Sequence, residues 1–474
     1  MEWSRLLSPK RPGFYGQASV KRTGDLRSEF EKDYHRIIGS SSFRRLQDKT
    51  QVFALDKSDF IRTRLTHSLE VSSFAKSLGQ NIAQYLIENK KDPGFTVEMK
   101  SDICDILQCA GLIHDIGNPP FGHFGEEAIR DWFERNLCKM TFKGNVITDL
   151  LSEQMLQDFY HFEGNAQAFR QVSKLHFLVN EHGMNLTYAL LNTIVKYPVS
   201  SCGINKKSGN IKDKKMGYFY AEQDLYMRIA EEMGTVGVRH PLTFILEAAD
   251  DIAYRTADIE DAFKKGCISY EKLREELLIA GEAAGAGQDG KVDAVAMLDH
   301  QYENAIKRNM ENPKLYAVQN FLVRMQSSLI FSATYGFTSN YEAIMAGTYE
   351  HDIFYQTYGE WVIKALGDIA YRYAFISKPI LMMEVSAGTI LEDLMNRFVP
   401  AAINYDTEVP LQMMEKKLMT LISENYRQIY HYYAKNAKTE EERLYLRLLL
   451  VSDFVSGMTD SYAKDLYQKL NGIV

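Results

Sequence analysis

The stretch Asp102–Phe133 constrains the fold of this 474-residue chain more than any other segment. Its first half carries apolar residues at the spacing of one buried helix face: Ile103, Ile106, Leu107, Ala110 and Ile113. A helix of this kind packs against other helices, and it ends in the pair His114 and Asp115. We therefore expect these two polar side chains at the inner end of a core helix, not in an exposed loop.

A glycine- and proline-rich turn follows this pair, with the sequence GNPPFG at Gly117–Gly122. The turn returns His123 towards His114, just before a second amphipathic run at Phe124–Leu137. An imidazole and a carboxylate in adjacent positions can both bind one divalent ion. Without further ligands, however, the pair is better interpreted as a packed histidine followed by a helix-capping aspartate.

Composition excludes several classes of protein. Hydrophobic residues make up 45% and charged residues 25%, which is typical of globular chains and excludes disordered and fibrous ones. No segment approaches the ~18 apolar residues of a membrane span, and the N-terminus lacks the apolar region of a secretory signal. We therefore expect a cytoplasmic protein with no membrane contact. A net charge of −7 argues against nucleic-acid binding over the whole surface but leaves a local basic groove open.

The five cysteines are scattered and form no CxxC pair, so we expect reduced thiols instead of disulfides or a zinc site. The length predicts a main domain with an appended region. We expect a basic N-terminal arm at 1–27, packed on the body or on a neighbouring subunit. A helical core should occupy 28–280, and a helical C-terminal region at 281–474 should complete the site and make subunit contacts.

Three segments interrupt the helical pattern. The small-residue stretch Ala280–Asp289 reads as a linker and the best domain boundary. Gln51–Leu55 reads as a short strand-like piece. The lysine- and glycine-rich segment Ser200–Gln223 should be a flexible loop or a small hairpin, and its lysines suit either a solvated surface or an anionic substrate.

Two further segments carry candidate ligands. His67 opens a long helix with an apolar face, where a histidine is more often a surface or cap residue. In the helical stretch Leu242–Phe263, Asp250, Tyr254 and Asp258 lie at i, i+4 and i+8, on one face. Carboxylates on an apolar helix are costly away from water unless they are paired, so this face suits a metal or a polar ligand. A solvated stripe is the alternative, because other charged residues of this helix must face water.

In chain order, His67, the pair His114-Asp115 and then Asp250 supply two imidazoles and two carboxylates that three helices could bring together. This order resembles the H…HD…D signature of HD-domain metal-dependent phosphohydrolases. The flanking motifs RTRLTHSLEV, LIHDIGNPPFGHFGE, FEGNAQ, KYP with KKMGYF, EAADDIAY and GMTDSYA are similar to those of the bacterial deoxyguanosinetriphosphate triphosphohydrolases. The resemblance implies an all-α fold: an HD-domain helical core, an additional helical C-terminal region and a small hairpin or loop insertion.

The resemblance also implies roles for individual residues. The implied metal ligands are His67, His114, Asp115 and Asp250. The implied catalytic pair is His123 and Glu126, with the glutamate holding and polarising the histidine. The implied triphosphate contacts are Arg64, Lys196, Tyr197 and Lys215, with Lys214 as an alternative to its neighbour. The implied sugar contacts are Gln51 and Asp258 at the 3′-hydroxyl and Tyr254 against the deoxyribose.

The implied reaction is metal-dependent hydrolysis of a deoxynucleoside triphosphate, preferably dGTP, at the α-phosphorus, which releases a deoxynucleoside and tripolyphosphate. Mn²⁺ or Mg²⁺ is the expected ion, and Co²⁺, Ni²⁺ or Fe²⁺ would also suit the ligands. His123 lies one helical turn from Glu126 and suits a general acid for the leaving O5′. The family further implies a homo-oligomer, commonly a hexamer, with dNTPs or single-stranded DNA as effectors.

Two other functions remain open at this point. An HD-type nucleotidase or phosphodiesterase would release orthophosphate or a linear nucleotide, whereas Lys196, Tyr197 and Lys215 favour a polyphosphate. A nucleotide- or DNA-sensing scaffold with an idle site is the non-enzymatic alternative. The presence of both His123 and Glu126 argues against it, because a scaffold needs no general acid.

Overall fold

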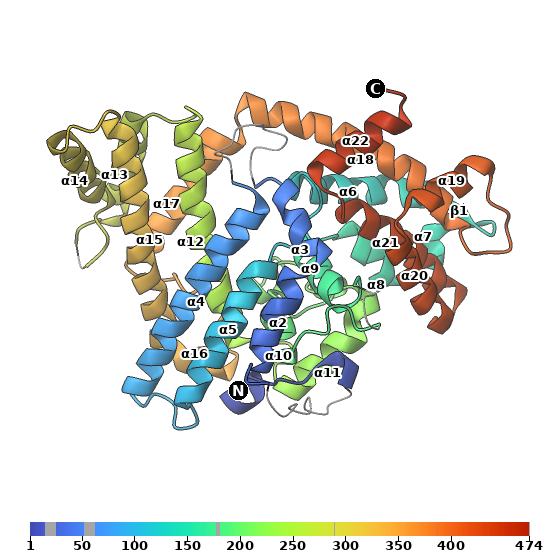
Figure 1. Ribbon diagram of the computed structural model, residues 1–474, viewed down its shortest axis with the longest axis horizontal. Helices are drawn as coiled ribbons and strands as arrows, with labels where there is room; N and C mark the ends of the chain where they lie inside the picture. The colour runs from blue at the N-terminus through green and yellow to red at the C-terminus, as the bar shows by residue number, and fades with distance from the viewer. Residues whose placement is uncertain (15–24, 52–61, 177–180, 289, 474) are drawn as a thin grey trace.

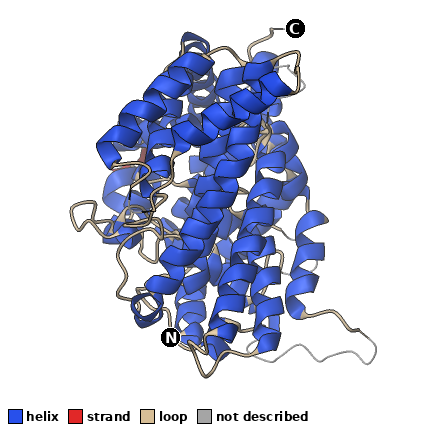
Figure 2. Cartoon of the chain, turned by 90° about the vertical axis from the view of Figure 1, so that its left-hand side faces the viewer, coloured by secondary structure: helices blue, strands red, loops and turns tan. Residues whose placement is uncertain are grey.

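The computed structural model describes residues 1–14, 25–51, 62–176, 181–288 and 290–473. Figures 1 and 2 show that helices make up most of this part of the chain, with one very small hairpin. Helix accounts for 69% and strand for 1%, so the predicted all-α class is confirmed.

The elements follow one another along the chain as follows. The first part contains α1 (Trp3–Leu6), α2 (Glu29–Ile38), α3 (Ser41–Arg45), α4 (Arg64–Glu88), α5 (Val97–Ile113), α6 (Gly122–Asn136), β1 (Thr141–Phe142), β2 (Asn145–Val146), α7 (Ile147–Leu150) and α8 (Glu153–Tyr160). The middle part contains α9 (Gly164–Ser173), α10 (Tyr188–Thr193), α11 (Gln223–Met233), α12 (Pro241–Lys264), α13 (Tyr270–Ala284), α14 (Ala294–Lys307), α15 (Pro313–Ser339) and α16 (Tyr341–Ala346). The last part contains α17 (Glu360–Ala370), a π-helical turn (Tyr371–Phe375), α18 (Lys378–Ile403), α19 (Met413–Leu421), α20 (Glu424–Asn436), α21 (Glu440–Ser456) and α22 (Asp460–Leu470).

Helices α4, α5 and α12 pack together and lie in the left half of the molecule in Figure 1. A capping box at Thr63 fixes the start of α4, and α12 begins with a proline at its first position, where the missing N–H costs nothing. The approach of α4 to α5 is very close, because a Cβ on Gly111 would lie only 2.5 Å from Cα of Ser72. The absence of a side chain on Gly111 therefore brings the end of α5 against the beginning of α4.

Two hydrophobic clusters make up the core of the described residues. The first surrounds α4, α5, α12 and α15, and the second surrounds α6, α8, α18 and α21. Ile116 belongs to the first cluster, whereas Phe121, five residues later, belongs to the second. The GNPPFG turn thus crosses from one cluster to the other, and residues on both sides of it are anchored in a packed interior.

The described N-terminal residues pack on the body of the same chain. Trp3 is 2% exposed, and its indole N–H donates to the Tyr341 hydroxyl over 2.7 Å. The Arg11 guanidinium lies 2.5 Å from Asp33, and both side chains are buried. The arm also contains the short helix α1, which the sequence pattern did not predict.

Local structure differs from expectation in two places, and a third prediction falls outside the described residues. The segment Ser200–Gln223 forms 3₁₀ turns at Ser201–Gly203, Ile211–Asp213 and Tyr220–Glu222, and the hairpin instead joins β1 to β2. The small-residue stretch predicted as a linker begins inside α13, which continues to Ala284 and ends at a left-handed Gly285. The predicted strand at Gln51–Leu55 lies outside the described residues apart from Gln51.

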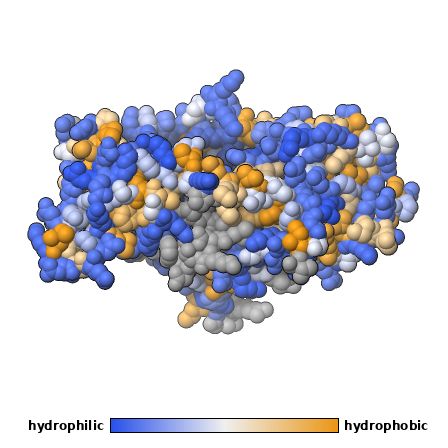
Figure 3. All heavy atoms as spheres, turned by 90° about the horizontal axis from the view of Figure 1, so that it is seen from above, coloured by the Kyte–Doolittle hydropathy of each residue, from blue (hydrophilic) through white to orange (hydrophobic). Residues whose placement is uncertain are grey.

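In the described part of the chain, no single helix has the length and apolar composition of a membrane span, although α17 with its π-helical turn and α18 pass that test as a pair bent by 74°. The face shown in Figure 3 is mostly hydrophilic, with apolar side chains in small separate groups.

Candidate active site

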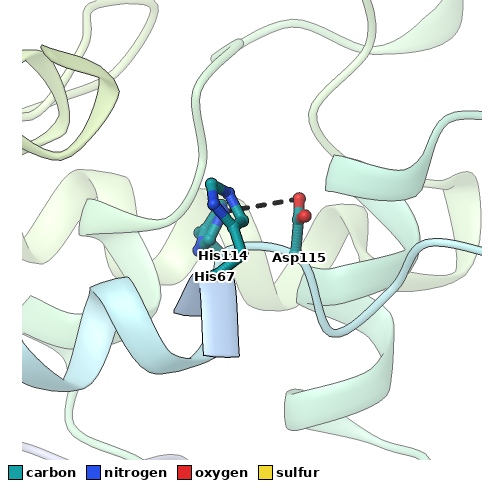
Figure 4. A group of neighbouring side chains, drawn as sticks. All are labelled: His67, His114 and Asp115. Carbon is teal, nitrogen blue, oxygen red and sulfur yellow. Dashed lines mark ion pairs between the residues drawn. The ribbon is translucent and has the colours of Figure 1, made fainter. Parts of the chain in front are cut away.

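Three side chains meet where α4 and α5 approach each other. His67 lies in the first turn of α4, His114 at the C-terminal end of α5, and Asp115 directly after it. One ligand atom from each lies within 4.8 Å of the others, and the three could hold one metal ion. Figure 4 shows the two imidazoles side by side with the Asp115 carboxylate facing His114. Their rings are 5.3 Å apart between centroids.

The hydrogen bonds of His114 set its orientation. Nδ1 lies 2.8 Å from the carbonyl oxygen of Gly111, to which it can donate only if it carries the ring proton. Nε2 is then a lone-pair donor, and it is buried without a hydrogen-bond partner. This nitrogen lies 3.5 Å from Asp115 Oδ1 and 3.4 Å from Asp250 Oδ1. An imidazole whose Nδ1 faces a backbone carbonyl and whose Nε2 faces carboxylates has the orientation that metal-binding histidines use.

Asp250 reaches the same point from α12. Its Oδ1 lies 3.2 Å from Nε2 of His67, and its Oδ2 accepts from Lys196 Nζ over 2.8 Å. In the same way, the Arg64 guanidinium lies 2.5 Å from Oδ2 of Asp115. Two imidazoles and two carboxylates therefore converge, and each carboxylate also contacts a cationic side chain.

These contacts shift the protonation equilibria of the group. Burial raises the pKa of Asp250, but Lys196 and His114 reverse this effect and hold the pKa well below its ordinary value. Burial lowers the pKa of His114, yet the charges of Asp115 and Asp250 outweigh it and the net shift is upward. The pKa of Asp115 is lowered as well, so both carboxylates are ionised at neutral pH, which is the form that binds a cation.

His123 and Glu126 form a second pair on the first turn of α6. His123 Nδ1 lies 3.1 Å from Glu126 Oε2, and the histidine side chain is 74% exposed whereas the glutamate is buried. The hydrogen bond to Glu126 raises the pKa of His123. The structure therefore presents an exposed imidazole, His123, whose protonated form is stabilised by the buried carboxylate of Glu126.

The backbone of α9 holds Glu126 in place. Its Oε1 accepts from the N–H of Gly164 over 2.8 Å. A Cβ on Gly164 would lie 2.5 Å from this oxygen and 2.1 Å from Oδ1 of Asn118, so only glycine permits the contact. The FEGNAQ motif thus supplies the amide that orients the pair.

A cavity of about 720 Å³ opens in front of both groups. Its lining includes the predicted residues Gln51, Arg64, Asp115, His123, Lys196, Tyr197, Lys215, Asp250 and Tyr254. Lys215 Nζ pairs with the buried Glu163 at 2.8 Å, while the adjacent Lys214 is exposed and does not line the cavity. Of the two lysines that the sequence left ambiguous, only Lys215 faces this space.

Asp258 is the predicted sugar contact that does not line the cavity. It lies one helical turn beyond Tyr254, is 2% exposed and hydrogen-bonds the Tyr254 hydroxyl. Burial raises the pKa of Asp258 well above its ordinary value. The structure therefore places Tyr254 at the cavity wall and Asp258 behind it.

Sequence reasoning missed the far wall of the cavity. This wall comes from α12, α17, the π-helical turn and the start of α18, and its residues are Asp251, Arg255, Gly367, Asp368, Tyr371, Phe375, Ile380, Met383, Glu384 and Ala387. Apolar residues at helical spacing have the same pattern whether they face a core or a cavity, so the sequence gives no signal for most of them. The charged exceptions among these residues are Asp251, Arg255, Asp368 and Glu384.

Comparisons with known proteins agree with this geometry. A family model described as "HD domain" matches residues 64–187, which include His67, His114 and Asp115. The chain is 46% identical, over the full length of both chains, to a protein of Listeria innocua named "deoxyguanosinetriphosphate triphosphohydrolase-like protein". Proteins of the same name from Synechocystis and Pseudomonas aeruginosa are 33% and 34% identical, over all of this chain and at least 99% of theirs. The chain therefore belongs to the deoxyguanosinetriphosphate triphosphohydrolase-like family of HD-domain hydrolases.

Proposed function

We propose that this protein hydrolyses deoxynucleoside triphosphates, preferentially dGTP, at the α-phosphorus and releases a deoxynucleoside and tripolyphosphate. The observation that carries this proposal is the common cavity that joins a candidate metal group, the His123–Glu126 pair and several cationic side chains. The names of full-length relatives supply the nucleotide and the reaction.

The donor set fits a divalent cation, since His114 Nε2 is buried without a partner beside two carboxylates. His67, His114, Asp115 and Asp250 would hold the ion, and Mn²⁺ or Mg²⁺ suits this mixture of nitrogen and oxygen ligands. When bound, such an ion neutralises phosphate charge and lowers the pKa of a coordinated water.

The cationic side chains would bind the phosphates. Arg64, Lys196 and Lys215 all line the cavity, and each now pairs with a carboxylate: Asp115, Asp250 and Glu163. A triphosphate offers oxygens that compete with these carboxylates for the same donors. Burial lowers the pKa of Lys215, but Glu163 and Glu126 outweigh this effect and raise it, so the side chain stays charged at neutral pH.

His123 would protonate the leaving O5′. Its exposed ring lines the cavity, and the carboxylate of Glu126 supports the protonated form. A positioned general acid typically accelerates a reaction by ~10²–10⁴-fold. Because the alkoxide of a nucleoside is a poor leaving group, this proton is the chemical contribution of the protein that the metal group does not make.

The sugar would lie between Gln51 and Tyr254, which both line the cavity. The Tyr254 ring stacks near Phe375, at 6.1 Å between ring centroids, and its hydroxyl is tied to Asp258. We propose that this fixed ring packs against the deoxyribose and leaves no room for a ribose 2′-hydroxyl.

A product analysis tests the proposed function. The purified protein is incubated with each dNTP and each NTP in the presence of Mn²⁺ or Mg²⁺, and the products are separated by anion-exchange chromatography. We expect tripolyphosphate and deoxynucleoside from dNTPs, fastest from dGTP, and no turnover of NTPs. Release of orthophosphate or a monophosphate would instead support an HD-type nucleotidase or phosphodiesterase, and no turnover of any nucleotide would support a scaffold.

A further inference from the structure

The junction between α21 and α22, residues Ser456–Asp460, lies against the back of the GNPPFG turn. Asp460 Oδ1 accepts from the backbone N–H of Phe121 over 2.9 Å, although 339 positions separate the two residues. The Lys49 ammonium connects the junction to the turn a second time, because it donates to the carbonyl oxygens of Asn118 and Ser456 over 2.5 and 2.8 Å. The C-terminal GMTDSYA motif therefore contacts the turn that carries His123.

Phe121 has an unusual backbone conformation that needs such support. Its φ of +65° lies in the left-handed region, which a residue with a large side chain rarely adopts. Phe121 is also the N-cap of α6, so its conformation sets the direction in which that helix begins. His123 follows two residues later, and any rotation at Phe121 moves its imidazole relative to the cavity.

The second oxygen of Asp460 holds another part of the site. Oδ2 accepts from the backbone N–H and the hydroxyl of Thr50, over 3.0 and 2.7 Å. The next residue, Gln51, lines the cavity. Asp460 is 2% exposed and does not itself line the cavity. One buried carboxylate thus ties the His123 side of the cavity to the Gln51 side.

We propose that Asp460 is a positioning residue that fixes His123 relative to Gln51, and hence the general acid relative to the bound sugar. This inference rests on the proposed function for its kinetic consequence. Its structural part, the control of His123 through Phe121, holds whatever the substrate is.

The hydrogen-bond donors around Asp460 require a side chain with two acceptor oxygens. Two backbone N–H groups and one hydroxyl point at its two oxygens. An asparagine has only one acceptor oxygen, so its NH₂ group would face a backbone N–H on one of the two sides. Asp460→Asn therefore breaks one of these hydrogen bonds, while the side chain keeps its size and α22 still begins at the same residue.

The experiment compares Asp460→Asn with a control variant, Glu424→Gln. Glu424 is the exposed first residue of α20, so the control also removes one negative charge from a helix start. The His123 pKa is read from ¹³C-histidine NMR spectra, with the signal assigned by its loss in His123→Ala. We expect the His123 pKa in Asp460→Asn to fall towards the ordinary value of about 6.5, because the imidazole moves with Phe121 while Glu126 stays hydrogen-bonded to Gly164. We also expect kcat with dGTP to fall by about 10-fold or more, since small misplacements of a reacting group can cost ~10²-fold. Mn²⁺ affinity and the Glu424→Gln control should be unchanged.

Thr50→Val keeps the proposal testable if Asp460→Asn does not fold. This variant removes only the hydroxyl contact with Oδ2, so we expect a higher KM with an unchanged His123 pKa. An unchanged His123 pKa and kcat in folded Asp460→Asn, or an unchanged KM in Thr50→Val, would overturn the inference. If the wild-type protein hydrolyses no nucleotide, the proposed function fails, while the NMR measurement still decides whether Asp460 positions His123.

Discussion

His123 and Glu126 form an ion pair whose two members lie in opposite environments. The imidazole is 74% exposed and faces the cavity, whereas the carboxylate 3.1 Å behind it is buried and also accepts the amide of Gly164. The Nε2 proton of the charged imidazole is therefore available to a ligand, whereas the Glu126 carboxylate that stabilises this charge is not.

Replacement of His123 by alanine should separate binding from turnover. We expect His123→Ala to lose about 10²–10⁴-fold in kcat, the usual contribution of a general acid, because no other protonated group occupies its place. Mn²⁺ and dGTP should still bind, since neither the metal group nor the cationic side chains change. Stopped-flow kinetics and isothermal titration calorimetry measure the two quantities, and near-normal turnover would exclude His123 as the acid.

The pH dependence of kcat should report the influence of Glu126. A general acid acts in its protonated form, so kcat should fall as pH rises through the pKa of His123. The hydrogen bond that His123 donates to Glu126 raises that pKa and extends activity to higher pH. Glu126→Gln should therefore move the alkaline limb of the profile to lower pH. A limb that stays in place, or moves to higher pH, would contradict the assigned roles.

The two adjacent lysines should differ in their effect on substrate binding. Lys215 lines the cavity, whereas Lys214 is exposed and does not. Lys215→Ala should raise KM by about 10–100-fold, since a hydrogen bond to a charged group contributes about 1.5–3 kcal/mol. Lys214→Ala is the matched control and should leave KM unchanged. Steady-state kinetics with dGTP compares the two, and a larger effect at Lys214 would reverse the assignment.

Gly164 should tolerate no side chain. Alanine would place its Cβ 2.5 Å from Glu126 Oε1, so Gly164→Ala should lower both thermal stability, by about 1–3 kcal/mol, and kcat. Gly94→Ala is a control on the exposed surface, where the nearest atom to the new Cβ is Asp92 Oδ1 at 3.3 Å. Differential scanning calorimetry measures the stability. Equal melting temperatures for the two variants would show that the contact with Glu126 is not tight.

The sequence predicted those parts of the molecule that depend on local patterns. Helical spacing identified the helix that ends before His114 and the one that carries Asp250, and α5 and α12 confirm both. Spacing alone did not identify the ligands; the order of His67, His114, Asp115 and Asp250 along the chain resembled the HD signature, and the structure brings the first three together.

Other features depend on long-range packing and left no local signal. The cavity wall around Tyr371 and Met383 consists of residues that look like ordinary core. Each strand of the β1–β2 hairpin is two residues long, which is too short for an alternating pattern to emerge. The contact between Asp460 and Phe121 joins residues 339 positions apart, so no spacing rule could reveal it.

Hydrolysis of dGTP in H₂¹⁸O tests the central claim most directly. Attack of water on the α-phosphorus breaks the bond between that phosphorus and O5′, so the new oxygen must remain on phosphorus. We predict that ³¹P NMR and mass spectrometry will find one ¹⁸O in a terminal phosphate of tripolyphosphate and none in deoxyguanosine. Release of pyrophosphate or orthophosphate, or ¹⁸O in the deoxyguanosine, would contradict this account.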